Sequence, residues 1–238
     1  MKHKRTLIIT LLLLCTALRL QAQFGVPNLL KYDKKPFHFG FTLGFNQFNY
    51  MISSKADLAE YDSLMLIHTR PVSGFSLGIV TNLRLGKYFD LRLIPGLSFG
   101  ARYIDYTIRY SSGKEIVTSK NVESVYLDIP LLLKFKSSRM LNNVRAYVLA
   151  GGQYSFDMIS AKKKKAPESG DVVLKLNPHD VQAQVGVGFD FYCTYFKFST
   201  ELKMSFGFLN MLVQENNMYA TSVTSLKAKN LQISFIFE

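Results

Sequence analysis

The sequence predicts an all-β fold: an eight-stranded antiparallel transmembrane β-barrel of the outer membrane, behind a cleaved signal peptide. Three observations lead to this prediction. Many stretches alternate between apolar and polar residues, several of them are long enough to cross a bilayer, and the connections between them alternate in length. This combination is typical of outer-membrane barrels, whose strands present one face to lipid and the other to the interior.

The clearest strand is the stretch Val122–Lys136. From Val125 to Phe135 every second residue is apolar, and the row contains no charge. A two-residue period indicates a β-strand with unlike faces. The stretch exceeds the roughly 5–6 residues of an ordinary strand. It also reaches the roughly 9–11 residues that a tilted strand needs to span a membrane.

The chain begins with a cationic stretch, MKHKR, followed by an apolar run, Thr6–Leu18, and a small residue at Ala22. This pattern predicts an export signal that is cleaved after Ala22. A retained helical anchor is the alternative, but the run is shorter than the roughly 20 residues that a spanning helix needs. The expected organisation is a signal peptide at residues 1–22, a periplasmic N-terminal segment at 23–36 and the barrel at 37–238.

Eight stretches alternate well enough to be predicted as strands. They are Phe37–Phe45, Gly74–Leu85, Phe89–Tyr110, Val122–Lys136, Val144–Phe156, Asp180–Tyr192, Lys197–Phe208 and Leu231–Phe237. A switch of parity in the third stretch predicts a β-bulge near Ile104–Asp105. Pro95 and Pro130 lie inside strands, where proline removes a backbone donor, and we expect bulges there or a misread strand.

The connections between these strands are alternately long and short. The long ones are Asn49–Pro71, Ser111–Asn121, Met158–Asn177 and Leu209–Ser225, and the short ones are Gly86–Lys87, Ser137–Asn143 and Cys193–Phe196. Short periplasmic turns and longer external loops follow this order in outer-membrane barrels. A soluble sandwich would also alternate, but with shorter strands and less regular loops.

Charged residues within the predicted strands share the parity that faces away from lipid. An eight-stranded barrel has an interior that side chains about fill, which excludes a general diffusion pore. We expect the charges to pair with one another, because an unpaired charge inside would be costly. The predicted interior charge network is Arg84, Asp90, Arg92, Arg102, Asp128, Lys134, Arg145, Asp190, Glu201 and Lys203.

Composition excludes several other classes of protein. The leader holds four basic residues and no acids, so removing it from a net charge of +12 leaves +8. These charges are dispersed, and no nucleic-acid-binding motif is present. Cys193 is the one cysteine after the leader, which excludes a disulfide scaffold and a cysteine metal cluster. The 13 tyrosines and 19 phenylalanines, with no tryptophan, suit a β-protein with an amphipathic wall.

Catalytic signals are weak. Gly74–Gly78 matches G-x-S-x-G, but that motif requires a strand-to-helix elbow, and here Ser76 is predicted in mid-strand. The histidines after the leader, His38, His68 and His179, have no metal-binding spacing. We therefore expect no enzyme activity, cofactor, metal or small-molecule substrate.

A run of four consecutive lysines lies in the third long connection. It consists of Lys162, Lys163, Lys164 and Lys165. We expect this run to be a solvated loop. The alternative is a loop contact for anionic lipopolysaccharide or an acidic partner, which the concentrated positive charge would attract.

A family resemblance suggests a role. The segment Lys34–Gly40, KKPFHFG, resembles the opening of the PorT family of Bacteroidetes. Tyr126–Lys134 is similar to a strand found more broadly among outer-membrane barrels of that phylum, and the resemblance extends from about Lys34 to Glu238. It implies an outer-membrane protein that the type IX secretion system needs to export cargo such as proteases or adhesins, with other secretion-system proteins as partners. The family supplies no catalytic motif.

Three hypotheses follow. The first is a non-enzymatic accessory component of that secretion machinery. The second is a small-barrel adhesin or membrane-integrity protein without a role in secretion, based on long external loops such as Asn49–Pro71. The third, a barrel enzyme using His38 or Ser76, is the weakest, because no convergent set of catalytic residues is evident.

Overall fold

The computed structural model describes residues 27–54, 64–109, 115–140, 142–165, 176–213 and 223–238. Nine strands, one α-helix and one short 3-10 helix account for the regular structure of these ranges. The elements are η1 (Tyr32–Lys34), β1 (Phe37–Ser54), β2 (Leu64–Arg84), β3 (Phe89–Leu93), β4 (Gly96–Arg109), β5 (Glu115–Lys136), β6 (Val144–Asp157), α2 (Met158–Lys165), β7 (His179–Tyr192), β8 (Lys197–Gly207) and β9 (Val223–Phe237). The leader predicted at 1–22 lies outside the described residues.

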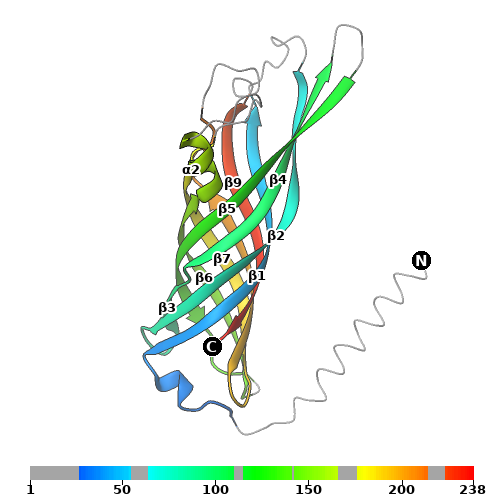
Figure 1. The fold of residues 1–238 in the computed structure, drawn as a ribbon. Coiled ribbons are helices and arrows are strands. Elements are labelled where there is room, and N and C mark those ends of the chain that lie inside the picture. The colour runs from blue at the N-terminus through cyan, green and yellow to red at the C-terminus, as the bar shows by residue number, and fades with distance from the viewer. Residues whose placement is uncertain (1–26, 55–63, 110–114, 141, 166–175, 214–222) are drawn as a thin grey trace, which may run out of the picture.

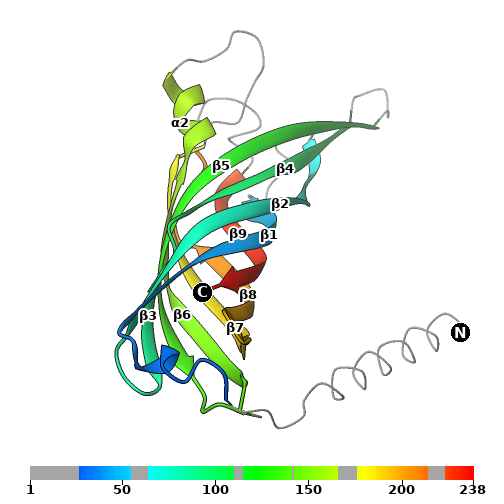
Figure 2. The same cartoon turned by 60° about the horizontal axis from the view of Figure 1, so that its bottom comes forward.

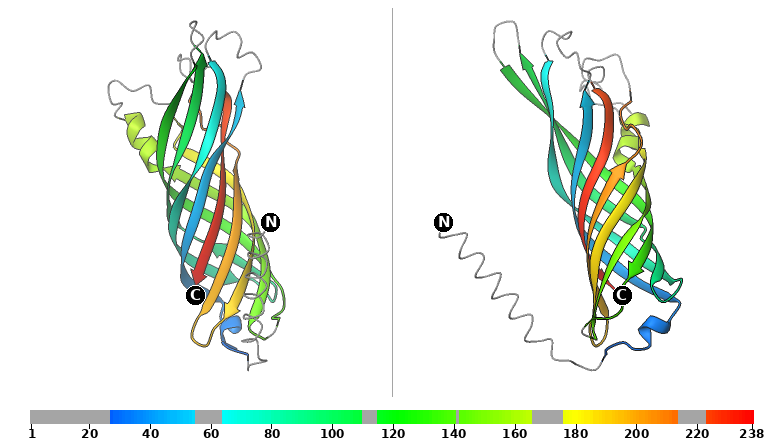
Figure 3. Two further views of the ribbon diagram at one scale, coloured as in Figure 1. Left: turned by 90° about the vertical axis from the view of Figure 1, so that its right-hand side faces the viewer. Right: turned by 180° about the vertical axis from the view of Figure 1, so that it is seen from behind.

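The strands close into a ring, which confirms the predicted antiparallel barrel (Figure 1). Strands that follow one another along the chain pair with each other, except β3 and β4, and β9 returns to pair with β1, side by side in Figure 3. The segments β3 and β4 lie one after the other between β2 and β5, so the wall has eight staves. Among the described residues, no helix is long and apolar enough to span a membrane.

The wall has an apolar outer surface and a polar interior. Leu131 is 50% exposed although it lies in the middle of the part of β5 that pairs with β6, while Lys134, three residues further along the strand, is 1% exposed. A soluble protein would place these side chains the other way round, because exposed apolar patches are small in soluble monomers. Aromatic pairs such as Phe41–Phe237 and Phe75–Phe99 stack on this outer surface. The sequence periodicity therefore sorts side chains between lipid and the interior.

Pro95 and Pro130 interrupt backbone bonding but cause no bulge, contrary to the prediction. The pairs Leu93↔Leu131 and Gly96↔Asp128 keep one register across both prolines. Ile94 N still donates to Pro130 O (3.2 Å), but Pro130 has no N–H to return. Pro95 likewise accepts from Ile79 N and donates nothing back. The missing donor explains why the third stave is assigned as two strands.

The predicted bulge near Ile104–Asp105 is also wrong. Pairing of β4 with β5 is continuous from Gly96 to Arg109. The irregularities of this stave lie on its other side, in β2, between Leu64 and Leu66 and between Pro71 and Phe75. The change in apolar parity instead occurs in the part of β4 that pairs with β5 before Tyr126, where β5 does not pair with β6. This part extends past the wall, where lipid does not require an apolar residue at every second position.

Three predicted loops are partly strand. β1 continues to Ser54, β5 begins at Glu115 and β9 begins at Val223. β6 pairs with β5 only from Tyr126 onwards, whereas β4 pairs with β5 along its whole length, so the β4–β5 hairpin extends past the wall (Figure 1). Residues outside the bilayer can stay in strands without an apolar row, so alternation underestimates strand length there.

The third predicted loop begins with a helix rather than irregular chain. α2 lies beside β5 at the end of the barrel with the long connections (Figure 1). Asp157 caps its N-terminus: the carboxylate accepts from Ile159 N (3.0 Å), Ser160 N (3.2 Å) and Ser160 Oγ (2.8 Å). This is a standard N-cap arrangement and explains why the strand changes to helix at this point.

The lysine run is therefore helical, and its prediction as loop is wrong. The second half of α2 consists of Lys162, Lys163, Lys164 and Lys165. Lysine is a good helix former, and the Asp157 cap supplies the start that a short helix needs, so the run continues the helix. The side chains of these four lysines lie outside the described residues.

Candidate functional site: a filled barrel interior

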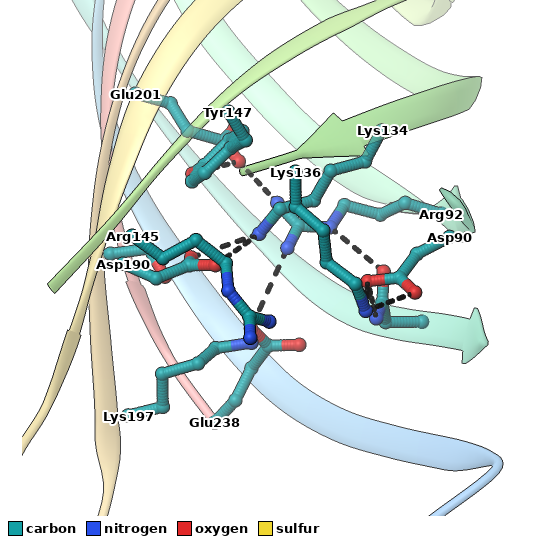
Figure 4. Close-up of polar contacts among 12 residues, drawn as sticks. Asp90, Arg92, Lys134, Lys136, Arg145, Tyr147, Asp190, Lys197, Glu201 and Glu238 are labelled. Carbon is teal, nitrogen blue, oxygen red and sulfur yellow. Dashed lines mark hydrogen bonds and ion pairs between the residues drawn. The ribbon is translucent and has the colours of Figure 1, made fainter. Parts of the chain in front are cut away.

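The interior of the barrel contains a cluster of charges drawn from the four strands β3, β5, β7 and β8 and from Glu238, the residue after β9, shown in Figure 4. Arg92 on β3 forms an ion pair with Glu201 on β8. These two strands lie four staves apart in either direction around the ring. The pair therefore crosses the full width of the barrel, and both side chains are fully buried.

Tyr147 and Lys203 complete the surroundings of Glu201. The Tyr147 hydroxyl donates to Glu201 Oε1 (2.7 Å), and Lys203 Nζ lies 3.4 Å from Glu201 Oε2. Gly188 makes room for the Tyr147 ring, because a Cβ there would lie 2.5 Å from its Cζ atom. A buried carboxylate needs several such donors to compensate for the loss of water.

A second carboxylate, Asp190 on β7, gathers its own donors. Lys134 Nζ lies 2.9 and 2.8 Å from its two oxygens, and Ser199 Oγ donates at 2.6 Å. The same Lys134 amine lies 3.5 Å from the centre of the Tyr147 ring, a cation–π distance. Tyr147 thus links the Glu201 and Asp190 groups into one network.

Two further ion pairs extend the network towards the end with the short turns. Lys136 Nζ lies 2.6 and 2.8 Å from the carboxylate oxygens of Asp90. Lys197 pairs with Glu238, whose carboxylate also lies 3.6 Å from Arg92. Each of these charges is buried and has an opposite charge within reach, as the low dielectric of an interior requires.

Towards the long connections the interior becomes less charged and contains a small cavity. Ser98 Oγ (2.5 Å), Ser155 Oγ (2.6 Å) and Gln153 Nε2 (2.9 Å) all donate to Asp128. A cavity of about 30 Å³ lies between Asp128 and Lys203, with hydroxyl and amide groups in its lining. A polar space of this size accommodates one or two water molecules rather than an organic ligand.

The structure brings together most of the residues predicted for the interior, with three exceptions. Arg84 is half-buried at the end of β2, where it donates to the carbonyl oxygens of Gly86 and Asp33. Arg145 lies at the same end as Arg84 and contacts Asp33. The side chain of Arg102 lies outside the described residues. The positions found in the network are Asp90, Arg92, Asp128, Lys134, Asp190, Glu201 and Lys203.

Parity could have identified some residues that the prediction missed. Lys136 shares the parity of Lys134, and Lys197 shares that of Glu201. Glu238 follows Ser234 on the inward face of β9. Tyr147 shares the parity of Arg145, but a tyrosine does not by itself indicate an ionic network.

The residues of the weak catalytic signals are far apart. Ser76 pairs with Gly44 in the ladder, while His38 pairs with Asn82, six residues further along. At about 3.3 Å per residue the two side chains are separated by roughly 20 Å. His179 bonds to the Tyr154 hydroxyl (2.6 Å) on the outer wall, and the side chain of His68 is outside the described residues. In the part of the chain that the structure describes, no cluster of His, Cys, Asp and Glu could hold a metal.

Comparison with solved structures gives outer-membrane barrels of low sequence identity. OprG of Pseudomonas aeruginosa is 13% identical, with 90% of this chain and 95% of that chain covered and a TM-score of 0.44. Neisserial surface protein A is 10% identical, with 85% and 98% covered and a TM-score of 0.43. Ail of Yersinia pestis, crystallised with the heparin analogue sucrose octasulfate, is 12% identical, with 85% and 99% covered and a TM-score of 0.37.

Comparison by sequence is more decisive. No curated protein matches the chain. The model of the family described as "Outer membrane protein beta-barrel domain" matches residues 21–213, which is most of the chain and includes the strands that build the charged interior. The chain belongs to this family of outer-membrane β-barrel proteins.

Proposed function

We propose that this protein is a non-enzymatic accessory component of a type IX secretion system in the outer membrane. The resemblance of Lys34–Gly40 to the opening of the PorT family supports the assignment to this system. In the structure this segment leads into β1 at the end of the barrel with the short turns, which faces the periplasm in outer-membrane barrels. A periplasmic end suits contact with machinery that receives cargo there.

The filled interior is the observation that carries the accessory role. Arg92 and Glu201 pair across the barrel, and Lys134 and Asp190 lie beside them. Unfolded cargo would need a far wider passage than an eight-stave barrel leaves. The protein therefore acts through its wall, its ends and its loops, as an anchored partner of a separate conduit.

Deletion of the gene tests this proposal. We expect cargo to accumulate in the periplasm and to return to the outside when the full chain is supplied in trans. A periplasmic enzyme without a sorting signal, measured in the same fractions, controls for leakage. A tagged copy, extracted in mild detergent, should carry other secretion-system proteins with it. Normal cargo export in the deletion strain would exclude the role.

Outer-membrane lipid and lipopolysaccharide are the proposed non-protein partners. The proposed contact is the lysine run of α2, which lies at the end with the long connections. Its members are Lys162, Lys163, Lys164 and Lys165. Four cations there would attract lipid phosphates. Replacing all four by glutamine should weaken retention on lipopolysaccharide-coated beads at low salt, and unchanged retention would exclude the contact.

A second candidate is a small-barrel adhesin or membrane-integrity protein. The β4–β5 hairpin favours it, because this hairpin extends beyond the wall at the end that faces outwards. Deletion would then leave cargo export normal but reduce surface binding or raise detergent sensitivity. Measuring export and detergent sensitivity in one deletion strain separates the two candidates.

A further inference from the structure

Residues 27–36 lie across the end of the barrel with the short turns. Figure 2, in which this end is turned forward, shows η1 beside β3 and β6. Asn28 N donates to Asn143 Oδ1 (2.8 Å), and Asn28 Nδ2 donates to Tyr192 O (3.1 Å). At the other end of the segment, Arg84 N donates to Pro36 O (2.8 Å). The segment is therefore tied to both sides of the mouth.

The central contact is the carboxylate of Asp33. It accepts from Arg139 Nε (2.9 Å), from both terminal nitrogens of Arg145 (3.3 and 3.1 Å) and from the Tyr192 hydroxyl (3.1 Å). Charge-assisted bonds from two guanidinium groups are among the strongest that a carboxylate can make. Asp33 thus fills a group of donors that the barrel itself provides.

These donors belong to β6, to β7 and to the turn between β5 and β6. The Arg145 side chain is only 10% exposed, on β6, and Tyr192 at the end of β7 is buried. Arg139 stacks on the Tyr192 ring, with 3.7 Å from its guanidinium carbon to the ring centre. The same guanidinium donates to the carbonyl oxygens of Asn28 (2.6 Å) and Leu29 (3.3 Å). Arg139 therefore holds the segment at three points.

Tyr32 closes the space next to Asp33. Its ring stacks on His38 with centres 4.0 Å apart, and its carbonyl oxygen bonds His38 Nε2 at 2.7 Å. Lys197 Nζ lies 4.9 Å from the centre of the same ring. His38 and Lys197 are buried and belong to the interior, so Tyr32 covers the charged network from the periplasmic side.

We propose that residues 27–36 form a strap that closes the periplasmic mouth of the barrel, and that Arg139, Arg145 and Tyr192 form a carboxylate-binding site in which Asp33 acts as the latch. The strap is releasable, because it is held by polar contacts at the mouth, several of them to one half-buried carboxylate, rather than by an apolar core. This proposal is independent of the secretion role, since it concerns access to the mouth and not export.

Thiol labelling of the full-length protein tests the strap. In a Cys193→Ser background, His38→Cys places a thiol beneath Tyr32. With Asp33 present, an impermeant maleimide should react slowly. Asp33→Asn or Arg139→Ala should accelerate the reaction at least tenfold, and Lys35→Ala, which removes an exposed charge from the same strap, should leave it slow. Heat-modifiable migration in gels confirms that each variant is folded.

Three results would overturn the proposal. Fast labelling of the thiol introduced at position 38 with Asp33 intact would mean that the strap leaves the mouth open. Slow labelling in both Asp33→Asn and Arg139→Ala would mean that Asp33 is not the latch. A spin label at the exposed position 31 gives a second readout that leaves His38 intact: it should be immobile in the parent and mobile in Asp33→Asn. A label that is equally mobile in both would also contradict the proposal.

Discussion

Arg92 and Glu201 lie on opposite staves of the barrel and meet in its centre. Neither side chain is exposed, and Tyr147 donates to the same Glu201 oxygen that Arg92 contacts. A buried pair of this kind is a poor source of net stability, but removing one partner leaves a charge without compensation. Because each of the two buried charges needs the other, the pair couples β3 and β8 across the barrel.

Glu201→Leu should lower the free energy of unfolding by about 3–5 kcal/mol, because the buried Arg92 would keep only its longer contact with Glu238, at 3.6 Å. The double variant Arg92→Met/Glu201→Leu should lose about 2 kcal/mol less than the sum of the single losses. The contact between Lys203 and Glu201 is lost both in Glu201→Leu and in the double variant, so its loss cancels when the double variant is compared with the sum of the single variants. Denaturant titration in lipid vesicles measures these values, and additive losses would contradict the coupling.

The filled interior predicts that the barrel does not conduct. Liposomes that contain the protein should take up neither small sugars nor salt faster than empty liposomes. Asp33→Asn should behave the same way, because it acts at the mouth and leaves the pairs of Arg92 and Lys134 in place. Steady conductance steps in the parent protein would contradict an interior sealed by these pairs.

The lipid-facing wall predicts a dependence on depth. Leu131 lies in the middle of the part of β5 that pairs with β6, Tyr126–Lys136, and Leu85 follows the end of β2; both are about half exposed. Leu131→Arg should cost about 2–4 kcal/mol of unfolding free energy in vesicles, whereas Leu85→Arg should cost at most about 1 kcal/mol. The matched pair separates burial in lipid from the general effect of adding arginine, and equal costs would place Leu131 outside the bilayer.

Strand positions were predictable where lipid meets the wall, because the membrane imposes an apolar residue at every second position. The prediction failed where that constraint ends. β1 continues to Ser54 and β5 begins at Glu115, in stretches where polar residues can face either side. The bulge expected at Pro130 is absent for a different reason: a strand can keep its register while one backbone donor is missing.

The interior could be predicted only as a set of residues. Parity places Arg92, Lys134 and Glu201 on the inner face, but which charges meet depends on stave order and stagger around the ring. The contact between Asp33 and Arg139 was beyond sequence reasoning, because both residues lie outside the strands and 106 positions apart. No periodicity relates two such segments.

The latch at Asp33 predicts a response to pH. Burial raises the pKa of this carboxyl group, but Arg145 and Arg139 together lower it further, so the pKa lies below its ordinary value when the strap is bound. A carboxyl group with a depressed pKa stabilises the bound state above its ordinary pKa of about 3.9 and loses that effect as the pH falls through the depressed value. The strap should therefore stay bound throughout the neutral range and detach only in strong acid.

A spin label at position 31 can follow this transition in nanodiscs. The label should be immobile from about pH 5 to 8 and become mobile only in acid below the ordinary aspartate pKa of about 3.9, because the bound carboxyl group has a depressed pKa. Asp33→Asn should be mobile at every pH. The groups that face the carboxylate are Arg139, Arg145 and Tyr192, and none of them is a histidine. Release at near-neutral pH would therefore exclude Asp33 as the titrating group.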